Sequence, residues 1–546
     1  MQSFLSTQSL LQGSLRTLER DVARLLVCNG FQNVREVARS GESGGADILA
    51  SKNGDSWIIR CFDVGGRSFP ELIRDLIDSA KFHGAGRVYL ATNRRLGERE
   101  VAELKRWQKV GLGVDVLEPK VLLSLAERSP EYPSGRKDLR SYQEEAMAGL
   151  LSALTHTGRG QVVLATGLGK TVVMAEVLAQ LFRDAALSSG RALVLAGTRE
   201  LVDQLQRAFW AQLPKWVATA RLMGGELPIS WDGVTFATVQ SAIARLEDLP
   251  DFDVLLIDEA HHVGSESLGS IIGRYATAMI GGVTATPWRG DGYDLDRVLG
   301  PPAMKMGIAD GIRLGYLCKA EYRLLSDGVD WKLVSKISRN RYSIGQLNRL
   351  LFLPSRDEEA AREIRATFDR ECRKSIIIFC QSVRHSLSFA ATLRLFGIRA
   401  EAINGEMSIK ERDRNMASFR SGHIQALTTR DLLNEGVDVP DVDMIVFMRV
   451  THSRRIFVQQ LGRGLRISPG KSKVVVLDFV SDLRRISEVI RLEQASKGGV
   501  ERISSVAQVN FESEPSGKFL MKWLADQADL LEREGDPILE IPGSWF

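Results

Sequence analysis

A chain of 546 residues is long enough to form about three or four domains, each with its own hydrophobic core. Its net charge of +4 permits a polyanionic partner without requiring one. Five cysteines without CxxC spacing argue against a zinc site or a disulfide framework, and we expect a reducing, cytoplasmic setting. The sequence has neither a signal-peptide pattern at its start nor a run of about 18 apolar residues, so we expect neither export nor a membrane partner.

Residues 1–127 alternate between helix and strand signals. Helices are predicted over 15–29, 69–82 and 98–110, and strands over 46–50, 57–62, 87–92 and 114–117. Between the first two strands lies the step Asn53-Gly54, which is typical of a tight hairpin. We therefore expect a small α/β domain, followed by a proline-containing linker over 128–137.

The strongest chemical signal is a glycine-containing turn between a predicted strand and a predicted helix. The turn consists of Thr166, Gly167, Leu168, Gly169, Lys170 and Thr171. Its glycines let backbone N–H groups converge on an anion, and the helix N-terminus adds positive partial charge. We expect Lys170 to reach the β- and γ-phosphates of a nucleotide and Thr171 to ligate Mg²⁺. The turn departs from the general phosphate-loop pattern at one position, where Leu164 replaces the first glycine.

Two carboxylates follow a buried strand predicted over 254–257. Because α/β sheets bind ligands at the carboxyl ends of parallel strands, Asp258 and Glu259 are expected at such an edge. We expect Asp258 to hold Mg²⁺ and Glu259 to position or deprotonate an attacking water. Acids also suit the first turn of a helix, but the phosphate loop earlier in the chain favours a catalytic pair.

From 138 to 485 the ordered motifs resemble those of superfamily 2 helicases with a DEAH sequence, and the region resembles the type I/III restriction-subunit branch. The acidic pair opens Asp258-Glu259-Ala260-His261, and residues 459–466 read QQLGRGLR. The resemblance implies two RecA-like domains, 138–310 and 311–485, that hold ATP and Mg²⁺ between them. Within the second, residues 316–370 are expected to be a connector with helical pieces.

The same resemblance assigns further residues to the site. Arg463 and Arg466 lie three apart, so they would share one helix face and act as arginine fingers on the γ-phosphate. Gln143 would pair with the adenine, and Asp438 would touch the ribose or the coupling network. The residues implied in coupling hydrolysis to nucleic-acid contact are Arg199, Thr238, Thr284, Thr286 and Thr429.

The order of elements over 15–126 resembles the Mrr-type branch of the PD-(D/E)xK nuclease fold. Glu19 on the first helix and Asp47 on the second strand match that family's acidic residues. The next strand carries Arg60 and Phe62 on one face, so both are expected to face Asp47, and Phe62 takes the place of the catalytic lysine. A phenyl ring cannot orient or polarise a metal-bound water, so the resemblance implies a degenerate nuclease site of Glu19, Asp47 and Arg60. DNA contact or protein docking would remain as the use of this domain.

Residues 486–546 are expected to form a C-terminal extension. A mixed connector leads to a helix over 519–531 whose apolar residues form one stripe. We expect this stripe to pack on the second RecA-like domain, and a partner-binding helix is the alternative. Protein partners are thus expected either at this helix or at the N-terminal domain.

The expected fold is α/β, with two RecA-like parallel-sheet motor domains, a preceding small restriction-endonuclease-like domain and a short helical C-terminal extension. We expect an ATP-dependent DNA helicase or translocase that works in restriction, defence or repair on single- or double-stranded DNA, with RNA as the less favoured partner. One alternative is an active nuclease–helicase in which Arg60 or Lys52 replaces the missing lysine. Another is an ATP-switched DNA-binding adaptor, although such a protein would not need Glu259 or arginine fingers.

Overall fold

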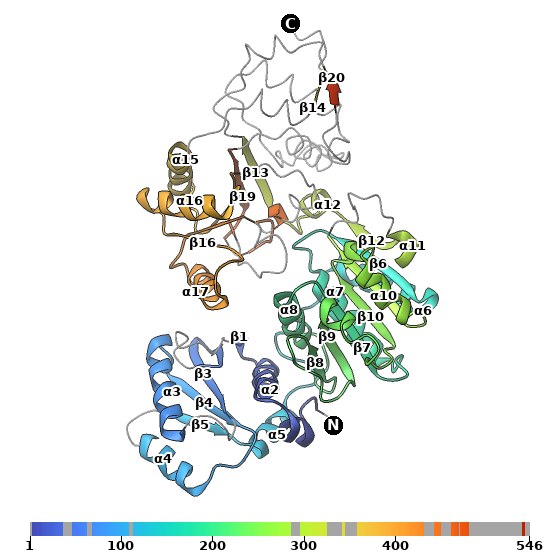
Figure 1. Ribbon diagram of the computed structural model, residues 1–546, viewed down its shortest axis with the longest axis vertical. Coiled ribbons are helices and arrows are strands. Elements are labelled where there is room, and N and C mark those ends of the chain that lie inside the picture. Colours follow the sequence, from blue (N-terminus) through green and yellow to red (C-terminus); the bar gives the residue numbers. More distant parts are fainter. Residues whose placement is uncertain are drawn as a thin grey trace. The chain divides into compact units, whose positions relative to one another are not determined.

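A computed structural model describes most of the chain (Figure 1). The described residues are 3–36, 46–62, 68–108, 113–285, 295–324, 341–343, 357–430, 442–448, 460–462, 464–468, 470–479 and 538–540. They belong to two compact units: Met1–Gln161 with Thr171–Val283 and Leu299–Ala303, and Val162–Lys170 with Thr284–Val298 and Met304–Phe546. Thr286, Asp438, Arg463 and the helix expected over 519–531 lie outside the described residues. No described helix is both long and apolar enough to cross a membrane.

The N-terminal domain is built on a five-stranded sheet whose strands follow chain order (Figure 1). These strands are β1 (Gln32–Glu36), β2 (Ile48–Lys52), β3 (Asp55–Phe62), β4 (Arg87–Thr92) and β5 (Val114–Leu117). The first three run antiparallel, and β3, β4 and β5 run parallel. Asn53 and Gly54 join β2 to β3 with φ values of 55° and 89°. Positive φ at both central residues is what a two-residue hairpin requires, so the expected turn is confirmed.

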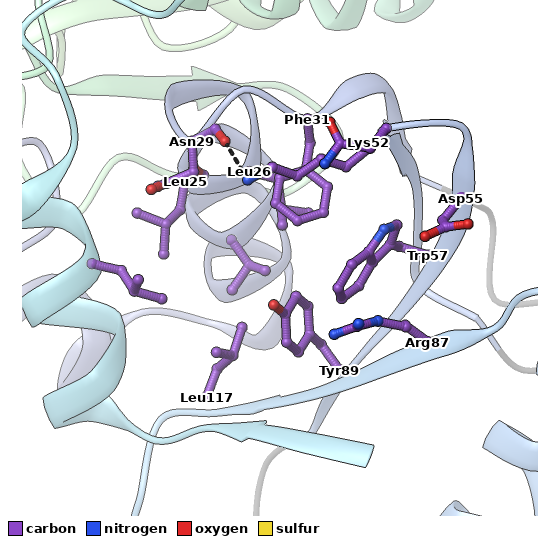
Figure 2. Close-up of a pocket in the computed structure, with 13 residues that line it drawn as sticks. Leu25, Leu26, Asn29, Phe31, Lys52, Asp55, Trp57, Arg87, Tyr89 and Leu117 are labelled. Carbon is purple, nitrogen blue, oxygen red and sulfur yellow. Dashed lines mark hydrogen bonds between the residues drawn. The ribbon is translucent and has the colours of Figure 1, made fainter. Parts of the chain in front are cut away.

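Helices cover both faces of this sheet. They are α1 (Thr7–Gln12), α2 (Leu15–Cys28), α3 (Phe69–His83), α4 (Glu98–Gln108) and α5 (Pro119–Arg128). Ile59 packs in the core beneath α2 and α5, whereas its neighbour Ile58 packs in the core beneath α3 and α4. A pocket opens on the α2 side of the sheet (Figure 2). The elements α1, β1 and α5 were not expected from the sequence; β1 reads QNVRE and has no alternation of apolar and polar residues.

The first RecA-like domain is built on a seven-stranded sheet. Its strands, in spatial order, are β12 (Pro302–Met306), β6 (Arg159–Leu164), β11 (Met279–Thr284), β10 (Val254–Asp258), β7 (Arg191–Ala196), β9 (Gly233–Thr238) and β8 (Thr219–Leu222). The five strands from β11 to β8 pair in parallel. Residues 254–257 are all buried, as expected for a strand covered on both faces. The helices are α6 (Ser141–Thr157), α7 (Lys170–Arg183), α8 (Arg199–Trp210), α9 (Val239–Ile243), α10 (Glu266–Arg274) and α11 (Asp296–Leu299).

The N-terminal domain packs directly on α8 and on the segment that follows it. Trp210, the last residue of α8, is buried in the same apolar cluster as Leu18 and Leu26 of α2. The Arg24 guanidinium donates to the carbonyl of Val217 at 2.7 Å, and the Lys215 ammonium donates to the carbonyl of Ser129 at 2.6 Å. These contacts lie within one compact unit, so the linker joins two domains that share a core.

Ion pairs reinforce this joint. Arg221 of β8 is 5% exposed and lies 3.0 Å from Glu36 of β1 and 2.9 Å from Asp203 of α8. Arg20 of α2 pairs with Glu226, which follows β8. Glu36 and Arg20 belong to the N-terminal domain. The Arg221–Glu36 pair therefore joins its edge strand β1 to the RecA-like domain, and the Arg20–Glu226 pair joins its helix α2.

The second RecA-like domain is built on a six-stranded parallel sheet. In spatial order its strands are β13 (Lys319–Leu324), β19 (Lys473–Asp478), β18 (Met444–Phe447), β15 (Ile376–Phe379), β17 (Ala426–Thr429) and β16 (Ala400–Ile403). Its helices are α12 (Ile308–Arg313), α15 (Asp357–Arg370), α16 (Val383–Leu395) and α17 (Ile409–Arg420), and a separate pair is formed by β14 (Arg341–Ser343) and β20 (Ile538–Glu540). The expectation of a connector with helical pieces over 316–370 is wrong at β13, where Ala320 and Tyr322 alternate with polar residues and bury into the sheet. The domain boundary expected after residue 310 falls inside α12.

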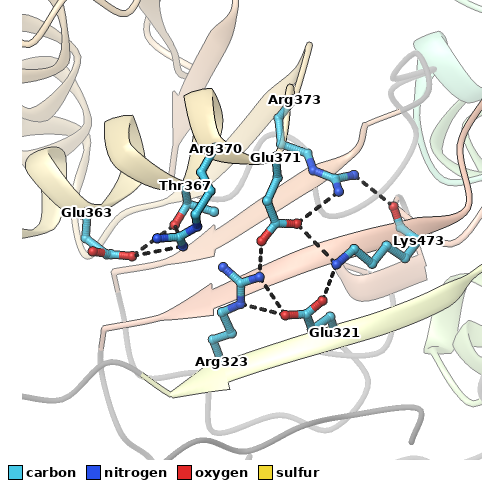
Figure 3. Close-up of polar contacts among 8 residues, drawn as sticks. All are labelled: Glu321, Arg323, Glu363, Thr367, Arg370, Glu371, Arg373 and Lys473. Atoms are coloured by element: carbon cyan, nitrogen blue, oxygen red, sulfur yellow. Dashed lines mark hydrogen bonds and ion pairs between the residues drawn. The ribbon is translucent and has the colours of Figure 1, made fainter. Parts of the chain in front are cut away.

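A charged network holds the edge strand β13 in place (Figure 3). Arg323 of β13 pairs with Glu371, which follows α15, and Lys473 of β19 lies 3.2 Å from the same carboxylate. Arg373 pairs with Glu371 at 3.0 Å, and Glu321 of β13 completes the network by pairing with Arg323 at 2.6 Å. Burial opposes ionisation of Glu371, but hydrogen bonds from Arg323 and Lys473 outweigh burial and lower its pKa from 4.5 to about 2.

This network predicts an acid-sensitive part of the stability. Because the folded pKa of Glu371 is depressed, its contribution is fully present above pH 4.5 and is lost as the pH falls through about 2. We expect Glu371→Gln to lower the midpoint temperature of thermal unfolding at pH 7. Between pH 4.5 and about 2, the midpoint of this variant should fall less steeply than that of the unmodified protein. Glu363→Gln is the matched control, because Glu363 is 39% exposed and lies 3.8 Å from Arg370. An unfolding midpoint with the same pH slope in Glu371→Gln and in the unmodified protein would contradict this assignment.

Candidate functional site

The phosphate loop has the backbone that its sequence predicts. It connects β6 to α7, and Gly167 and Gly169 adopt φ values of 93° and 84°. Only glycine takes up such values at little cost, and here they turn the chain into the first residue of a 14-residue helix, Lys170. The backbone N–H of Ala165 donates to the carbonyl of Met306 at 2.9 Å, which fixes the start of the loop. Converging N–H groups at a helix N-terminus suit an anionic phosphate.

The acidic pair lies where β10 ends. Asp258 is the last residue of the strand and is half-buried, and Glu259 adopts the left-handed conformation with φ 50° and ψ 53°. A non-glycine residue in this region is strained, and such strain gathers at sites where function fixes a side chain. His261 is buried, and its Nδ1 lies 3.3 Å from the Glu259 Oε2. The DEAH sequence contained this histidine, but its approach to the Glu259 carboxylate was not expected from the sequence.

The chain segment with the predicted arginine finger runs against the phosphate loop. A Cβ at Gly462 would lie 2.5 Å from the Cβ of Thr166, and a Cβ at Gly167 would lie 3.3 Å from the Cγ of Arg466. Both segments belong to the second compact unit. The structure therefore brings Thr166, Gly167 and Arg466 together, and the glycines at 167 and 462 are the residues that allow this close approach.

Gln143 is buried in the first turn of α6. Its side-chain oxygen accepts a hydrogen bond from the backbone N–H of Arg140 at 3.0 Å, which holds the carboxamide in one position. The predicted contact with an adenine stays a prediction.

The residues expected to couple hydrolysis to nucleic-acid contact lie at strand ends or helix starts. Arg199 opens α8, and its guanidinium carbon lies 3.3 Å from where a Cβ on Gly224 would be. Thr238 is the N-cap of α9, with its hydroxyl oxygen accepting from the N–H of Ser241 at 3.1 Å. Thr284 and Thr429 end β11 and β17 and are fully buried. Their contact with a nucleic acid remains a prediction.

In the N-terminal domain, two of the three residues expected in the degenerate nuclease site, Asp47 and Arg60, form an ion pair. The Asp47 carboxylate is 1% exposed; one oxygen lies 3.1 Å from the Arg60 guanidinium, and the other accepts from the N–H of Cys61 at 2.7 Å. A cation would have to compete with Arg60 for this carboxylate. Glu19 is on α2, and no cluster of three or more His, Cys, Asp or Glu able to hold a metal exists among the described residues.

We therefore expect the protein to make no Mg²⁺-dependent cut in DNA. Asp47→Ala should instead destabilise the protein by about 3 kcal/mol, because it removes the carboxylate beside a nearly buried Arg60. The double variant Asp47→Ala/Arg60→Met should recover part of that loss, since it removes the charge as well. Thermal unfolding and a plasmid-cleavage gel measure the two effects. A metal-dependent cut that Asp47→Ala abolishes would show that the nuclease site is active.

Comparisons with known proteins match all three regions. Residues 136–289 match the model of the type III restriction enzyme res subunit, 359–468 the helicase conserved C-terminal domain, and 10–114 the Mrr-type restriction endonuclease. The chain thus carries a helicase region of two parts, preceded by an Mrr-type restriction endonuclease domain. The resemblances drawn from the sequence to superfamily 2 helicases and to the Mrr branch are confirmed, and proteins of the helicase families bind ATP.

Two curated relatives match the helicase region. A putative ATP-dependent helicase of Saccharomyces cerevisiae, IRC3, is 27% identical over 355 residues, covering 63% of this chain and 51% of the relative. A putative mitochondrial ATP-dependent helicase of Schizosaccharomyces pombe is 30% identical over 364 residues, covering 64% of this chain and 58% of the relative. The chain thus spans a little over half the length of these relatives.

A solved structure shares the fold of this chain. The ATP-dependent Type ISP restriction-modification enzyme LlaBIII, solved bound to DNA, aligns with a TM-score of 0.52 and 15% identity, over 98% of this chain and 43% of that one. The likeness supports the α/β fold of the described residues, with parallel-sheet helicase domains after an Mrr-like domain.

Proposed function

We propose that this protein is an ATP-hydrolysing DNA translocase or helicase. The observation that carries the proposal is the strained Glu259 at the carboxyl end of β10, in the sheet whose strand β6 leads into the phosphate loop. A carboxylate on a strained residue, 3.3 Å from the His261 imidazole, suits the positioning or deprotonation of an attacking water. A protein that only binds nucleotide would not need that group.

Oxygen ligands for Mg²⁺ are available from the residues present. Thr171 offers a hydroxyl in the first turn of α7, and Asp258 offers a half-buried carboxylate at the end of β10. Mg²⁺ prefers oxygen ligands and would neutralise charge on the phosphates. Lys170 and the loop N–H groups bind the phosphates, Gln143 contacts the adenine, and Arg466 with Arg463 supports the γ-phosphate charge. Asp438 contacts the ribose or the coupling network.

We propose DNA as the nucleic acid along which the protein moves. An Mrr-type restriction endonuclease domain precedes the helicase region, and LlaBIII, which shares the fold, was solved bound to DNA. We propose that the N-terminus of α8 and Arg199 contact the phosphates of the strand, and that Thr238, Thr284, Thr286 and Thr429 help couple hydrolysis to that contact. We place the protein in restriction, defence or repair and in the cytoplasm, where its five cysteines, which form no disulfide, remain reduced.

The experiment is phosphate release from ATP with Mg²⁺, in the absence of nucleic acid and with single-stranded DNA, double-stranded DNA or RNA. The DNA is then examined on a gel. Stimulation by one form of DNA, with the DNA uncut, supports a motor with a degenerate nuclease domain. Stimulation by RNA alone would contradict the proposed track, and cleaved DNA would contradict the degenerate site. Binding of ATP without hydrolysis under every condition would favour an ATP-switched adaptor.

A further inference from the structure

A pocket of about 330 Å³ lies in the N-terminal domain between α2, the β2–β3 hairpin and strands β3 and β4 (Figure 2). This volume lies within the range of small-ligand sites. Trp57 of β3 shares its face of the sheet with Ile59, whereas Arg60, the partner of Asp47, shares the opposite face with Ile58. The pocket is therefore separate from the degenerate nuclease site.

Three aromatic rings line the pocket. Trp57 lies with its ring centroid 5.0 Å from that of Tyr89, at an angle of 32°, and it meets the ring of Phe31 edge-on at 5.4 Å. Trp57 is 8% exposed, and its indole N–H has no hydrogen-bond acceptor within the described part of the chain. A buried donor without an acceptor calls for an explanation, and a ligand acceptor at this pocket would supply one.

Two cations lie over these rings. The Lys52 ammonium is 4.7 Å from the centroid of Phe31, and the Arg87 guanidinium carbon is 5.2 Å from the centroid of Trp57. An aromatic cage that binds a quaternary ammonium or a methylated lysine would not have cationic side chains of its own over its rings. The two cations over the rings of this pocket therefore disfavour a cationic ligand. The lining also contains one carboxylate, Asp55, but the two cations outnumber it and favour a ligand that carries a negative group next to a flat ring.

We propose that this pocket binds an unstacked nucleobase together with its adjoining phosphate. The rings of Trp57 and Tyr89 contact the base, the Trp57 N–H donates to an acceptor on the base edge, and Lys52 and Arg87 attract the phosphate. The base could belong to a DNA strand that the motor handles or to a free nucleotide. For the first source the inference rests on the proposed function, because it takes DNA as the motor's track.

The test uses the full chain and a single-stranded trinucleotide with 2-aminopurine at its centre, whose fluorescence is quenched when the base stacks on an aromatic ring. We expect saturable quenching, and we expect Arg87→Glu to weaken the apparent affinity about tenfold. Arg74→Glu is the matched control, since Arg74 is exposed on α3, which covers the opposite face. Tyr89→Leu should reduce the depth of quenching. Thermal unfolding checks that each variant is folded.

A second arm uses 2-aminopurine deoxynucleoside monophosphate with the Lys170→Ala chain, so that the phosphate loop does not contribute. Equal affinity for both probes, each sensitive to Arg87→Glu, assigns the pocket to a free nucleotide; tighter binding of the trinucleotide assigns it to a DNA strand. Absence of saturable quenching with both probes, or equal weakening by Arg74→Glu, overturns the proposal. Phosphate release by the unmodified protein is measured in parallel: hydrolysis without quenching refutes only the pocket, and quenching without hydrolysis refutes only the motor.

Discussion

Glu259→Gln is expected to lower the rate of ATP hydrolysis by about a thousandfold or more while ATP still binds. The amide has nearly the shape of the carboxylate but cannot accept a proton from an attacking water. Because Glu259 follows β10 directly, the change leaves the strand and Asp258 in place. Phosphate release measures the loss, and a fluorescent ATP analogue measures the retained binding. Retained turnover would remove Glu259 from the catalytic role.

The matched control is Glu266→Gln, because Glu266 is an exposed residue of the next helix, α10. We expect that control to hydrolyse ATP at the rate of the unmodified protein. A second variant, Glu259→Gly, tests the strain at φ 50°. Glycine adopts this conformation freely, so Glu259→Gly should stabilise the protein by about 1 kcal/mol even though hydrolysis is lost. Destabilisation by this variant would show that the backbone at this position is not strained.

The elements predicted correctly from the sequence are those with a local signal. The strand over 254–257 was predicted because four apolar residues precede two acids, and the structure ends β10 at Asp258. The hairpin was predicted because Asn-Gly accepts positive φ at both positions. The pairing of Arg60 with Asp47 also agrees with the expectation that Arg60 would face this carboxylate. These signals depend on neighbouring residues, so they can be interpreted without knowledge of the tertiary structure.

The features that were missed depend on residues far apart in the chain. Strand β13 is short, and it is held in the sheet by its pairing with β19 and by Glu371 and Lys473, about 50 and 150 residues later. The joint between the N-terminal and first RecA-like domains likewise depends on Arg221 and Lys215, polar residues that resemble surface positions until their partners are known. Residues such as Arg463 and Asp438 lie outside the described structure, so their roles remain predictions.

The contact between the N-terminal and first RecA-like domains predicts a second large effect, a loss of stability. Arg221→Ala should destabilise the protein by about 3 kcal/mol, because it leaves the carboxylates of Glu36 and Asp203 without the buried cation between them. Arg191→Ala is the matched control: Arg191 also begins a strand of this sheet region, but it is 35% exposed and pairs with Asp232, which is 71% exposed, at 3.4 Å. An exposed pair of this kind contributes less than about 1 kcal/mol. Thermal and denaturant unfolding of the full chain compare the two variants.

Hydrogen exchange locates the effect. Because Arg221 holds β1 through Glu36, and Arg20 holds α2 through the neighbouring Glu226, exchange in β1 and α2 should accelerate in Arg221→Ala and remain unchanged in Arg191→Ala. A nuclease-like domain that is merely tethered by a linker would not respond to a substitution on β8 of the RecA-like domain. Unchanged exchange in β1 and α2, together with equal stability of the two variants, would therefore show that the domains do not share a core. Acceleration would show that β8 and the N-terminal elements β1 and α2 stabilise one another through these ion pairs.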